Sequence, residues 1–403
     1  MAASASASAS PLVAASASSG PPPPSRDATT QLSAHPAQAI AQAIAWMGGG
    51  RYADARSLLI AAERRHPDDA RFAPLILRAC DEDPAYAPRI KRLRPDSDVT
   101  AIRRLGGGKS ITLKLMHHHT IVGVLKPAQR GGAGGYHGEI ASWRLCPLIR
   151  CGFHIAYNRR VAILKEEFDT LYRRSDDDAQ QRYAKRFDEL LIHTSKDGRQ
   201  WVQGALEDWV PEFAPFPIER TTTWNSWLRQ PADGGATMTS LQAPAMDAFT
   251  IADTRGHAGF LRLLKKHLRG ASRRQLARQL SNVIAFDFLV SNWDRFSTSK
   301  KFVGANCQIR RGNIVSIDNG AAFPLYPQRS PGRRLKLVQR FSRTLVAALR
   351  ALPKQATRKR LFRRVGNDDK RRFALFWKQR AALLAYIDAL IAQYGKANVL
   401  SFE

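Results

Sequence analysis

Residues 282–323 read NVIAFDFLVSNWDRFSTSKKFVGANCQIRRGNIVSIDNGAAF and contain the strongest structural signal in the chain. An apolar run from Val283 to Val290 predicts a buried helix. A polar break carrying Asp294 follows, and a short apolar strand then leads to Asp318. Loops held by flanking helices and strands are common positions for catalytic groups. Two carboxylates placed in this way are part of what phosphoryl transfer requires: one orients a hydroxyl and one holds a divalent metal.

A lysine and a glutamate precede this stretch, in the order that the same chemistry requires. Lys126 ends the third strand of an expected β-meander, and Glu139 lies on the helix expected to follow, over 137–150. An ammonium in that position reaches nucleotide phosphates when a carboxylate on the next helix holds it. Taken singly, either residue is more often a solvated surface charge. The ordered pair is therefore what carries the prediction.

Three consecutive glycines, Gly106, Gly107 and Gly108, separate the first two expected strands, over 99–104 and 111–116. Such a turn lets backbone N–H groups approach phosphates, so the three glycines are candidate nucleotide-binding residues. A flexible hairpin is the alternative explanation. The segment is not a Walker A motif, because the glycine spacing differs and a strand follows instead of a helix.

Composition and charge narrow the class of protein. The 403 residues are 44% hydrophobic and 24% charged, which is typical of a globular protein with two or three domains or a two-lobed core. No apolar run approaches the about 18 residues of a membrane span, and the N-terminus lacks the features of a signal peptide. The formal net charge of +29 implies attraction to an anionic partner.

The four cysteines are scattered, at Cys80, Cys146, Cys151 and Cys307. None forms a C-x-x-C pair, so neither a zinc site nor a disulfide framework is expected. Buried free thiols in a reducing compartment are the expectation.

The chain divides by composition into three parts. Residues 1–34 are rich in Ala, Ser and Pro and are expected to be a disordered tail. Residues 35–95 are expected to be helical, and the pattern that begins G-R-Y-x-D-A at Gly50 resembles one tetratricopeptide hairpin, a possible protein-docking element. One repeat cannot bury its apolar face alone, so it is expected to pack on a further helix or on the main domain. Residues 96–403 form that domain, and 165–200 are expected to be a polar insertion within it.

Four segments in order carry a family resemblance. They are V-L-K-P at 124–127, H-G-E-I-A-S-W-R-L at 137–145, F-D-F-L-V-S-N-W-D-R at 286–295 and I-D-N-G-A-A-F at 317–323. Together they resemble the atypical kinases of the four-jointed family, which includes the Golgi casein kinase and the glycan xylosyl kinase. More distantly they resemble the HipA and phosphoinositide kinase group. G-A-L-E-D-W-V-P at 204–211 looks like the family's hinge between lobes.

The resemblance implies an α+β, two-lobed protein-kinase-like fold, with a small β-rich N-lobe over about 96–205 and a helical C-lobe over 206–403. It implies ATP and Mg²⁺ or Mn²⁺ as cofactors. By the same resemblance Lys126 contacts the phosphates, Glu139 positions Lys126 or a metal, and Asp294 is the catalytic base. Asp318 is the metal ligand. In related sequences an Asn a few residues after the D-R helps to hold the metal; no Asn stands that close to Asp294 here, and Asn306 is the candidate for this role.

Three functions remain open at this point. The favoured one is an ATP-dependent phosphotransferase acting on a hydroxyl of a protein Ser/Thr, with a sugar or lipid as other acceptors. The alternative is a catalytically inactive scaffold that binds nucleotide and partner proteins. Nucleic-acid binding ranks last, since no zinc finger, RNA-recognition signature or aromatic platform is visible. The basic C-lobe favours an anionic surface or acidic protein partner, and a cytoplasmic location is expected.

Overall fold

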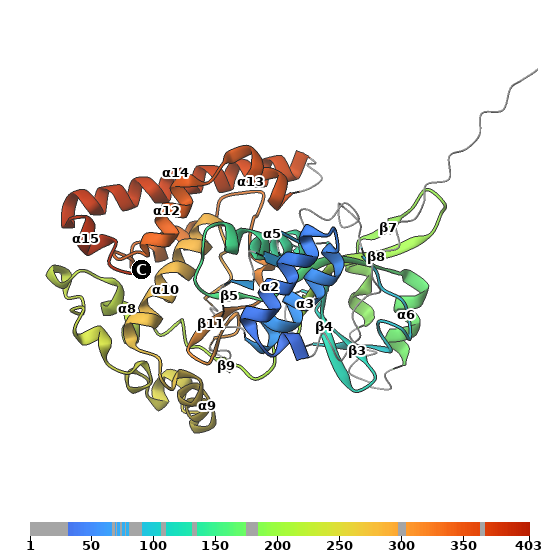
Figure 1. The fold of residues 1–403 in the computed structure, drawn as a ribbon, viewed down its shortest axis with the longest axis horizontal. Coiled ribbons are helices and arrows are strands. Elements are labelled where there is room, and N and C mark those ends of the chain that lie inside the picture. Colours follow the sequence, from blue (N-terminus) through green and yellow to red (C-terminus); the bar gives the residue numbers. More distant parts are fainter. Residues whose placement is uncertain are drawn as a thin grey trace, which may run out of the picture.

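The computed structural model describes residues 31–66, 69, 71, 72, 75, 76, 78, 79, 91–105, 110–130, 135–174, 184–296, 304–362 and 367–403. The expectation for Gly106, Gly107 and Gly108 lies outside these residues, as does that for the first 30 residues of the tail expected at 1–34. Residues 31–33 are helical, so the expected tail extends too far at its C-terminal end. Figure 1 shows a β-rich lobe on one side and a helical lobe on the other, with the N-terminal helices packed between them in this view. The predicted α+β fold class is confirmed, with a β-rich lobe and a helical lobe.

The β-rich lobe contains a seven-stranded sheet in the order β1-β6-β8-β4-β3-β2, with β7 paired to β8. β2, β3 and β4 form the expected antiparallel meander, and β8 pairs with the far side of β4. The strand bounds are β1 Lys91–Arg92, β2 Ala101–Arg104, β3 Leu113–His117, β4 Thr120–Pro127, β6 Asn158–Leu164, β7 Ile192–Thr194 and β8 Gln200–Asp208.

Helices pack on the sheet through side chains that alternate along β4 and β8. Successive side chains of a strand point to opposite faces. Leu125 and Leu206 join the core of this lobe together with the helix α6 (Lys165–Arg173). Their neighbours Lys126 and Glu207 point to the other face, where the helix α5 (Gly135–Leu148) contributes Glu139. The sheet thus separates an apolar core from a charged cluster.

The expected insertion at 165–200 is only partly correct. Its first turns form α6, which buries Phe168, Leu171 and Tyr172 in the core of the β-rich lobe. These residues stand at the i, i+3 and i+4 spacing of an amphipathic helix. The charged residues before and after them concealed that pattern in the sequence. α6 is therefore part of the lobe that supports Lys126.

The helical lobe surrounds a small sheet in the order β5-β11-β10-β9. The strands are β5 His154–Ile155, β9 Ala214–Pro215, β10 Cys307–Arg310 and β11 Asn313–Ser316. The helices are α8 Thr221–Leu228, α9 Ala258–Leu268, α10 Arg273–Leu289, α11 Arg329–Leu335, α12 Arg343–Ala351, α13 Lys354–Leu361, α14 Asn367–Tyr394 and α15 Lys396–Val399. Within the described part of the chain, no helix is long and apolar enough to cross a bilayer.

The centre of the helical lobe is α10. Its N-terminus is capped by Ser272, whose side chain accepts a hydrogen bond from the backbone N–H of Gln275 at 3.1 Å. From Leu276 to Leu289 almost every residue is buried, and α8, α11, α14 and β11 all pack on the helix. A helix buried on all sides cannot shift without disturbing the whole lobe. The loop that carries Asp294 therefore begins from a fixed point.

The N-terminal helices α2 (Pro36–Gly48) and α3 (Tyr52–Arg65) pack on each other. They bury Ala39, Ala43, Met47, Leu58 and Leu59 in a hydrophobic cluster that also contains the core of the helical lobe. Phe72 and Ile76 belong to the same cluster. The expectation that a single hairpin would have to pack on neighbouring structure is thus confirmed.

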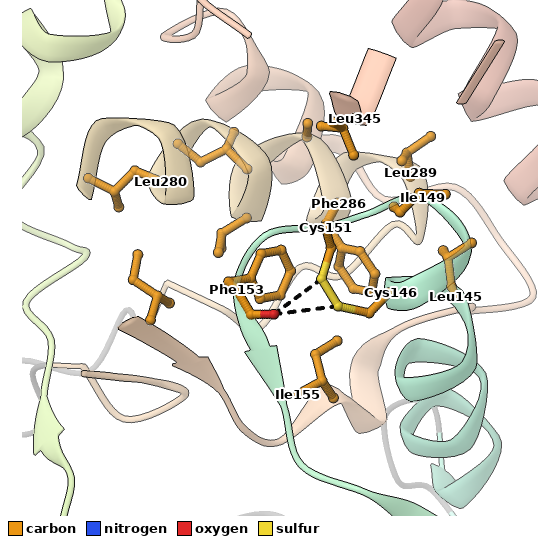
Figure 2. Close-up of a cluster of buried hydrophobic side chains, with 14 of the residues drawn as sticks. Leu145, Cys146, Ile149, Cys151, Phe153, Ile155, Leu280, Phe286, Leu289 and Leu345 are labelled. Carbon is orange, nitrogen blue, oxygen red and sulfur yellow. Dashed lines mark hydrogen bonds between the residues drawn. A yellow bond between two sulfur atoms is a disulfide. The ribbon is translucent and has the colours of Figure 1, made fainter. Parts of the chain in front are cut away.

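One expectation about the cysteines is wrong. Cys146 and Cys151 form a disulfide, shown in Figure 2 among the apolar side chains of α5 and α10. α5 ends at Leu148, and the chain reverses so that the backbone N–H of Cys151 donates to the carbonyl oxygen of Cys146 at 3.0 Å. The Cα atoms of the two cysteines are 4.9 Å apart, within the range that a disulfide spans. Sequence spacing alone did not reveal this turn. Cys307 is buried as a free thiol, as expected.

Candidate active site

Four chain segments meet at Lys126. Its Nζ lies 2.6 Å from Glu139 Oε1 on α5, 3.2 Å from Glu207 Oε2 on β8 and 3.2 Å from Asp318 Oδ1 after β11. We call these four residues the Lys126 cluster. Sequence order suggested three of its members, and the fold brings those three together across both lobes. Glu207 is the member that sequence reasoning missed.

Glu139 connects the β-rich lobe to the loop of Asp318. Its side chain is fully buried, and its second oxygen, Oε2, accepts a hydrogen bond from the backbone N–H of Asn319 at 3.0 Å. The preceding Gly138 makes this approach possible: a Cβ there would lie 2.7 Å from the carbonyl oxygens of both Asn319 and Ala322. Since real Cβ atoms do not come so close, any other residue would push α5 away from the loop.

The Lys126 cluster is unbalanced in charge, with three carboxylates around one ammonium. Burial, opposed by Lys126, raises the pKa of Glu139 to about 7. Burial also raises the pKa of Glu207, again against the pull of Lys126. For Lys126, burial acts to lower the pKa, but Asp318 and the two glutamates outweigh it and hold the pKa well above its ordinary value. The cluster therefore favours a further cation or a proton.

Asp318 is the exposed member of the cluster. Its side chain is 41% exposed, whereas that of Glu139 is 0% exposed. The backbone of Asp318 has a positive φ of 53°, a left-handed conformation that Asp adopts more readily than most non-glycine residues. Lys126 keeps the pKa of Asp318 below its ordinary value, so this residue presents a charged carboxylate. The loop thus places one ionised group at the opening of a buried cluster.

Asp294 lies in the loop after α10. Its backbone N–H donates to Asn292 Oδ1 at 3.1 Å, which closes a tight turn. Asn306 Nδ2 donates to the backbone oxygen of Asp294 at 2.8 Å and to its carboxylate Oδ2 at 3.2 Å. The structure thus places Asn306, expected as a metal ligand, in direct contact with the expected catalytic base.

Arg295 joins the loops of Asp294 and Asp318 and is the second residue that sequence reasoning left without a role. Its side chain is 0% exposed and forms two contacts of 3.3 Å with the carboxylate of Asp287. Its Nη1 donates to the backbone oxygens of Asn306 and, at 2.8 Å, of Ile317. Its Nη2 donates to Asn319 Oδ1 at 2.6 Å. A guanidinium with several fixed donors is suited to holding two loops at one separation.

The chemistry of these side chains fits a magnesium or manganese ion. Mg²⁺ is usually held by one or two carboxylates together with substrate phosphates and water, and not by a cage of protein ligands. Asp318 offers an exposed carboxylate, and Arg295 draws the backbone of Asn306 close to the strand end that precedes Asp318. Among the described residues, no group of three His, Cys, Asp or Glu side chains could hold a metal alone. A metal here would complete its coordination with water or with phosphate oxygens of a ligand.

No protein-family model matches the chain, and no curated protein matches it. Among solved structures, the chain is similar to hydra Fam20, whose structure was solved with sugar. The two chains are 14% identical, and the alignment covers 82% of this chain and 93% of that chain with a TM-score of 0.46.

Proposed function

We propose that this protein is an ATP-dependent phosphotransferase that moves the γ-phosphoryl group of ATP to a hydroxyl acceptor. One observation carries the proposal: the Lys126 ammonium is held by a buried glutamate on α5 and faces Asp318 on a loop tied to that of Asp294. Phosphoryl transfer needs this combination of a phosphate-binding lysine, a metal-binding carboxylate and a second carboxylate at the acceptor.

In this proposal Lys126 binds the phosphates of ATP. Its side chain is 11% exposed, so the ammonium is largely buried, next to the more exposed carboxylate of Asp318. Glu139 fixes its position, because both oxygens of Glu139 are already engaged. A lysine held in this way contributes charge to phosphate without having to be reoriented during the reaction.

Asp318 would hold Mg²⁺ or Mn²⁺, and Asn306 is the candidate for a further ligand. When bound, the metal neutralises negative charge on the transferring phosphate oxygens. The net negative charge of the Lys126 cluster supports a cation at this position.

Asp294 would orient the acceptor hydroxyl and receive its proton. The hydroxyl oxygen forms a bond to the γ-phosphorus while the bond from that phosphorus to the β–γ bridging oxygen breaks, and ADP leaves. Asn306 holds Asp294 through its backbone oxygen and its carboxylate, and Arg295 ties the same loop to the backbone of Ile317. Both therefore act as positioning residues. Positioning of this kind supplies much of the rate enhancement in phosphoryl transfer.

The favoured acceptor is a Ser or Thr of a protein, with sugar and lipid hydroxyls as the other classes. The net charge of +29 supports an acidic substrate or surface, since oppositely charged molecules associate faster.

Transfer of label from γ-labelled ATP tests the proposal. The wild type, Asp318→Ala and Asp294→Ala are incubated with Mg²⁺ or Mn²⁺ and with a cell lysate or the protein itself as acceptor. Label is expected to enter protein only with the wild type and with Asp388→Ala, a control that removes a surface carboxylate paired with Arg350. Equal incorporation by the wild type and Asp318→Ala would exclude the proposal.

A catalytically inactive, nucleotide-binding scaffold is the second candidate. The hydrogen bond from Asn306 to the carboxylate of Asp294 favours it, because that bond engages the group that would take the proton. A scaffold would show thermal stabilisation by ATP and Mg²⁺ with no label transfer. An active enzyme would show both.

A further inference from the structure

A cleft lies between α13 and the first half of α14, away from the Lys126 cluster. It has a volume of about 380 Å³. Its lining consists of Lys354, Gln355, Arg358, Lys370, Phe373, Ala374 and Trp377. We call it the α13–α14 cleft. Both helices run along one edge of the helical lobe in Figure 1.

The floor of the cleft is aromatic. Phe373 is buried, and its ring stacks on Trp377 with an interplanar angle of 27° and centroids 5.8 Å apart. The guanidinium of Arg380 lies 4.5 Å from the centre of the Trp377 ring, and Lys354 Nζ lies 5.8 Å from it. Two cations and the Phe373 ring thus already lie next to the indole. A nucleobase, which binds by stacking on a free aromatic face, is poorly matched to this floor, whereas an aliphatic or aromatic side chain can pack against its edge.

The rim of the cleft is cationic. Lys354, Arg358 and Lys370 line it, and none of the described lining residues is acidic. Arg380 is committed elsewhere, because its Nε donates to the carbonyl oxygen of Leu349 at 2.7 Å. Arg358 differs: its Nε is buried yet has no hydrogen-bond partner within the described residues. A buried donor without an acceptor costs stability. The Nε of Arg358 is therefore suited to donate to an oxygen of a bound partner.

We propose that the α13–α14 cleft is a docking site for an acidic peptide segment of a partner protein. One apolar side chain of the peptide packs against Phe373 and Trp377, and flanking carboxylates pair with Arg358, Lys354 and Lys370. Charge complementarity decides the occupant, since the rim offers three cations and the volume fits one or two side chains. Carboxylates bound to guanidinium make strong, directional hydrogen bonds.

The cleft is attached to the elements of the candidate active site. Arg372 on α14 donates through Nη1 to the backbone oxygen of Phe323, the residue that ends the segment beginning at Asp318. The ring of Phe323 packs against Phe376 with centroids 5.8 Å apart. On the other wall, the carbonyl oxygen of Arg360 on α13 accepts from Arg144 on α5 at 3.2 Å. A docked peptide would therefore lie on two helices that contact elements of the candidate active site, although the binding itself does not depend on phosphotransferase activity.

Fluorescence anisotropy with a labelled peptide Glu-Asp-Glu-Phe-Glu-Asp-Glu tests the proposal on the full chain. The matched peptide Gln-Asn-Gln-Phe-Gln-Asn-Gln removes the charges and keeps the aromatic residue. Saturable binding of the acidic peptide, weakened at least about tenfold by the amide replacement, is expected. Equal binding of the two peptides would overturn the proposal, because it would remove the role of the cationic rim.

The double variant Arg358→Glu, Lys370→Glu is expected to bind the acidic peptide at least about tenfold more weakly than the wild type. Lys359→Glu, Arg371→Glu changes the net charge equally on the same two helices, at exposed residues outside the lining, and is expected to bind within about twofold of the wild type. Thermal unfolding of both variants checks that they are folded. Equal weakening by the two variants, or tighter binding of single-stranded oligothymidylate or phosphatidylserine vesicles with the same sensitivity to Arg358 and Lys370, would overturn the proposal.

Discussion

Two buried ionic groups lie within the same part of the molecule and differ in their balance. Arg295 and Asp287 are one cation against one anion, and the remaining donors of Arg295 are taken by backbone oxygens and by Asn319. The Lys126 cluster has one cation against three carboxylates, and one of these, Asp318, is 41% exposed. The first group is closed and complete, whereas the second opens to solvent with surplus negative charge.

This difference in charge balance distinguishes an ion pair that stabilises the fold from a charged cluster that can bind a ligand. A buried pair persists when charge and hydrogen bonds are matched, because desolvation of each ion is otherwise uncompensated. The Arg295–Asp287 pair meets that condition and fixes the geometry of two loops. The Lys126 cluster does not meet it in isolation, which is expected of residues that bind a charged ligand. Removing one carboxylate from each group should therefore have unequal results.

Asp287→Asn is expected to have the largest effect on stability. It leaves the Arg295 guanidinium buried without its anion, and breaking such a pair typically costs about 3–5 kcal/mol in the free energy of unfolding. Chemical denaturation measures the change. Asp388→Asn, which disrupts a pair whose side chains are 50% and 55% exposed, should cost at most about 1 kcal/mol. Similar losses in the two variants would contradict the structural role assigned to Arg295.

Glu207→Gln should behave differently in the absence of ligand. Burial already raises the pKa of Glu207, so its charged form is disfavoured in the folded protein. Removal of that charge leaves Lys126 with two other carboxylates. We therefore expect the free energy of unfolding to be unchanged or to increase by up to about 1 kcal/mol. A loss of unfolding free energy as large as that of Asp287→Asn, measured under the same conditions, would contradict the difference in charge balance between the two groups.

The pH dependence of stability offers a smaller and more specific comparison. The pKa of Glu139 is raised from 4.5 to about 7 in the folded protein, so the folded state holds the proton more tightly than the unfolded state does. This contribution is fully present below pH 4.5 and is lost as the pH rises to about 7. The stability of the wild type relative to Glu139→Gln is therefore expected to fall over that window.

Denaturation at a series of pH values measures this difference, and contributions from the histidines cancel when the two proteins are compared. The exposed substitution Glu166→Gln on α6 serves as the control and should follow the wild type. A constant difference between wild type and Glu139→Gln from pH 4.5 to 7 would show that Glu139 does not titrate in this range.

Three residues of the Lys126 cluster could be predicted from the sequence, whereas the fourth, Glu207, could not. Lys126, Glu139 and Asp318 each stand at an end or on a face of a regular element, so their order along the chain predicted their convergence. Glu207 could not be selected in the same way, because it stands beside Asp208. Only the register of β8 against β4, with Glu207 opposite Val124, places its side chain on the same face as Lys126.

Other features depend on backbone geometry that residue patterns do not reveal. The partners of Arg295 include the carbonyl oxygens of Asn306 and Ile317, and any residue at those positions would present the same oxygens. The Cys146–Cys151 disulfide depends on the reversal of the chain after α5, which spacing alone does not specify. The change of periodicity along the chain predicted a strand-rich part followed by a helical part, because periodicity is a property of side chains, whereas the two-lobed arrangement was implied by the family resemblance.

Binding of Mn²⁺ in the presence of a non-hydrolysable ATP analogue, followed by electron paramagnetic resonance, is the most direct test of the open, charge-unbalanced cluster. We predict that the wild type and Asp388→Asn bind Mn²⁺ together with the nucleotide, whereas Asp318→Asn loses that binding while its unfolding is little changed. Undiminished Mn²⁺ binding by folded Asp318→Asn would contradict the assignment of the Lys126 cluster as a metal–nucleotide site.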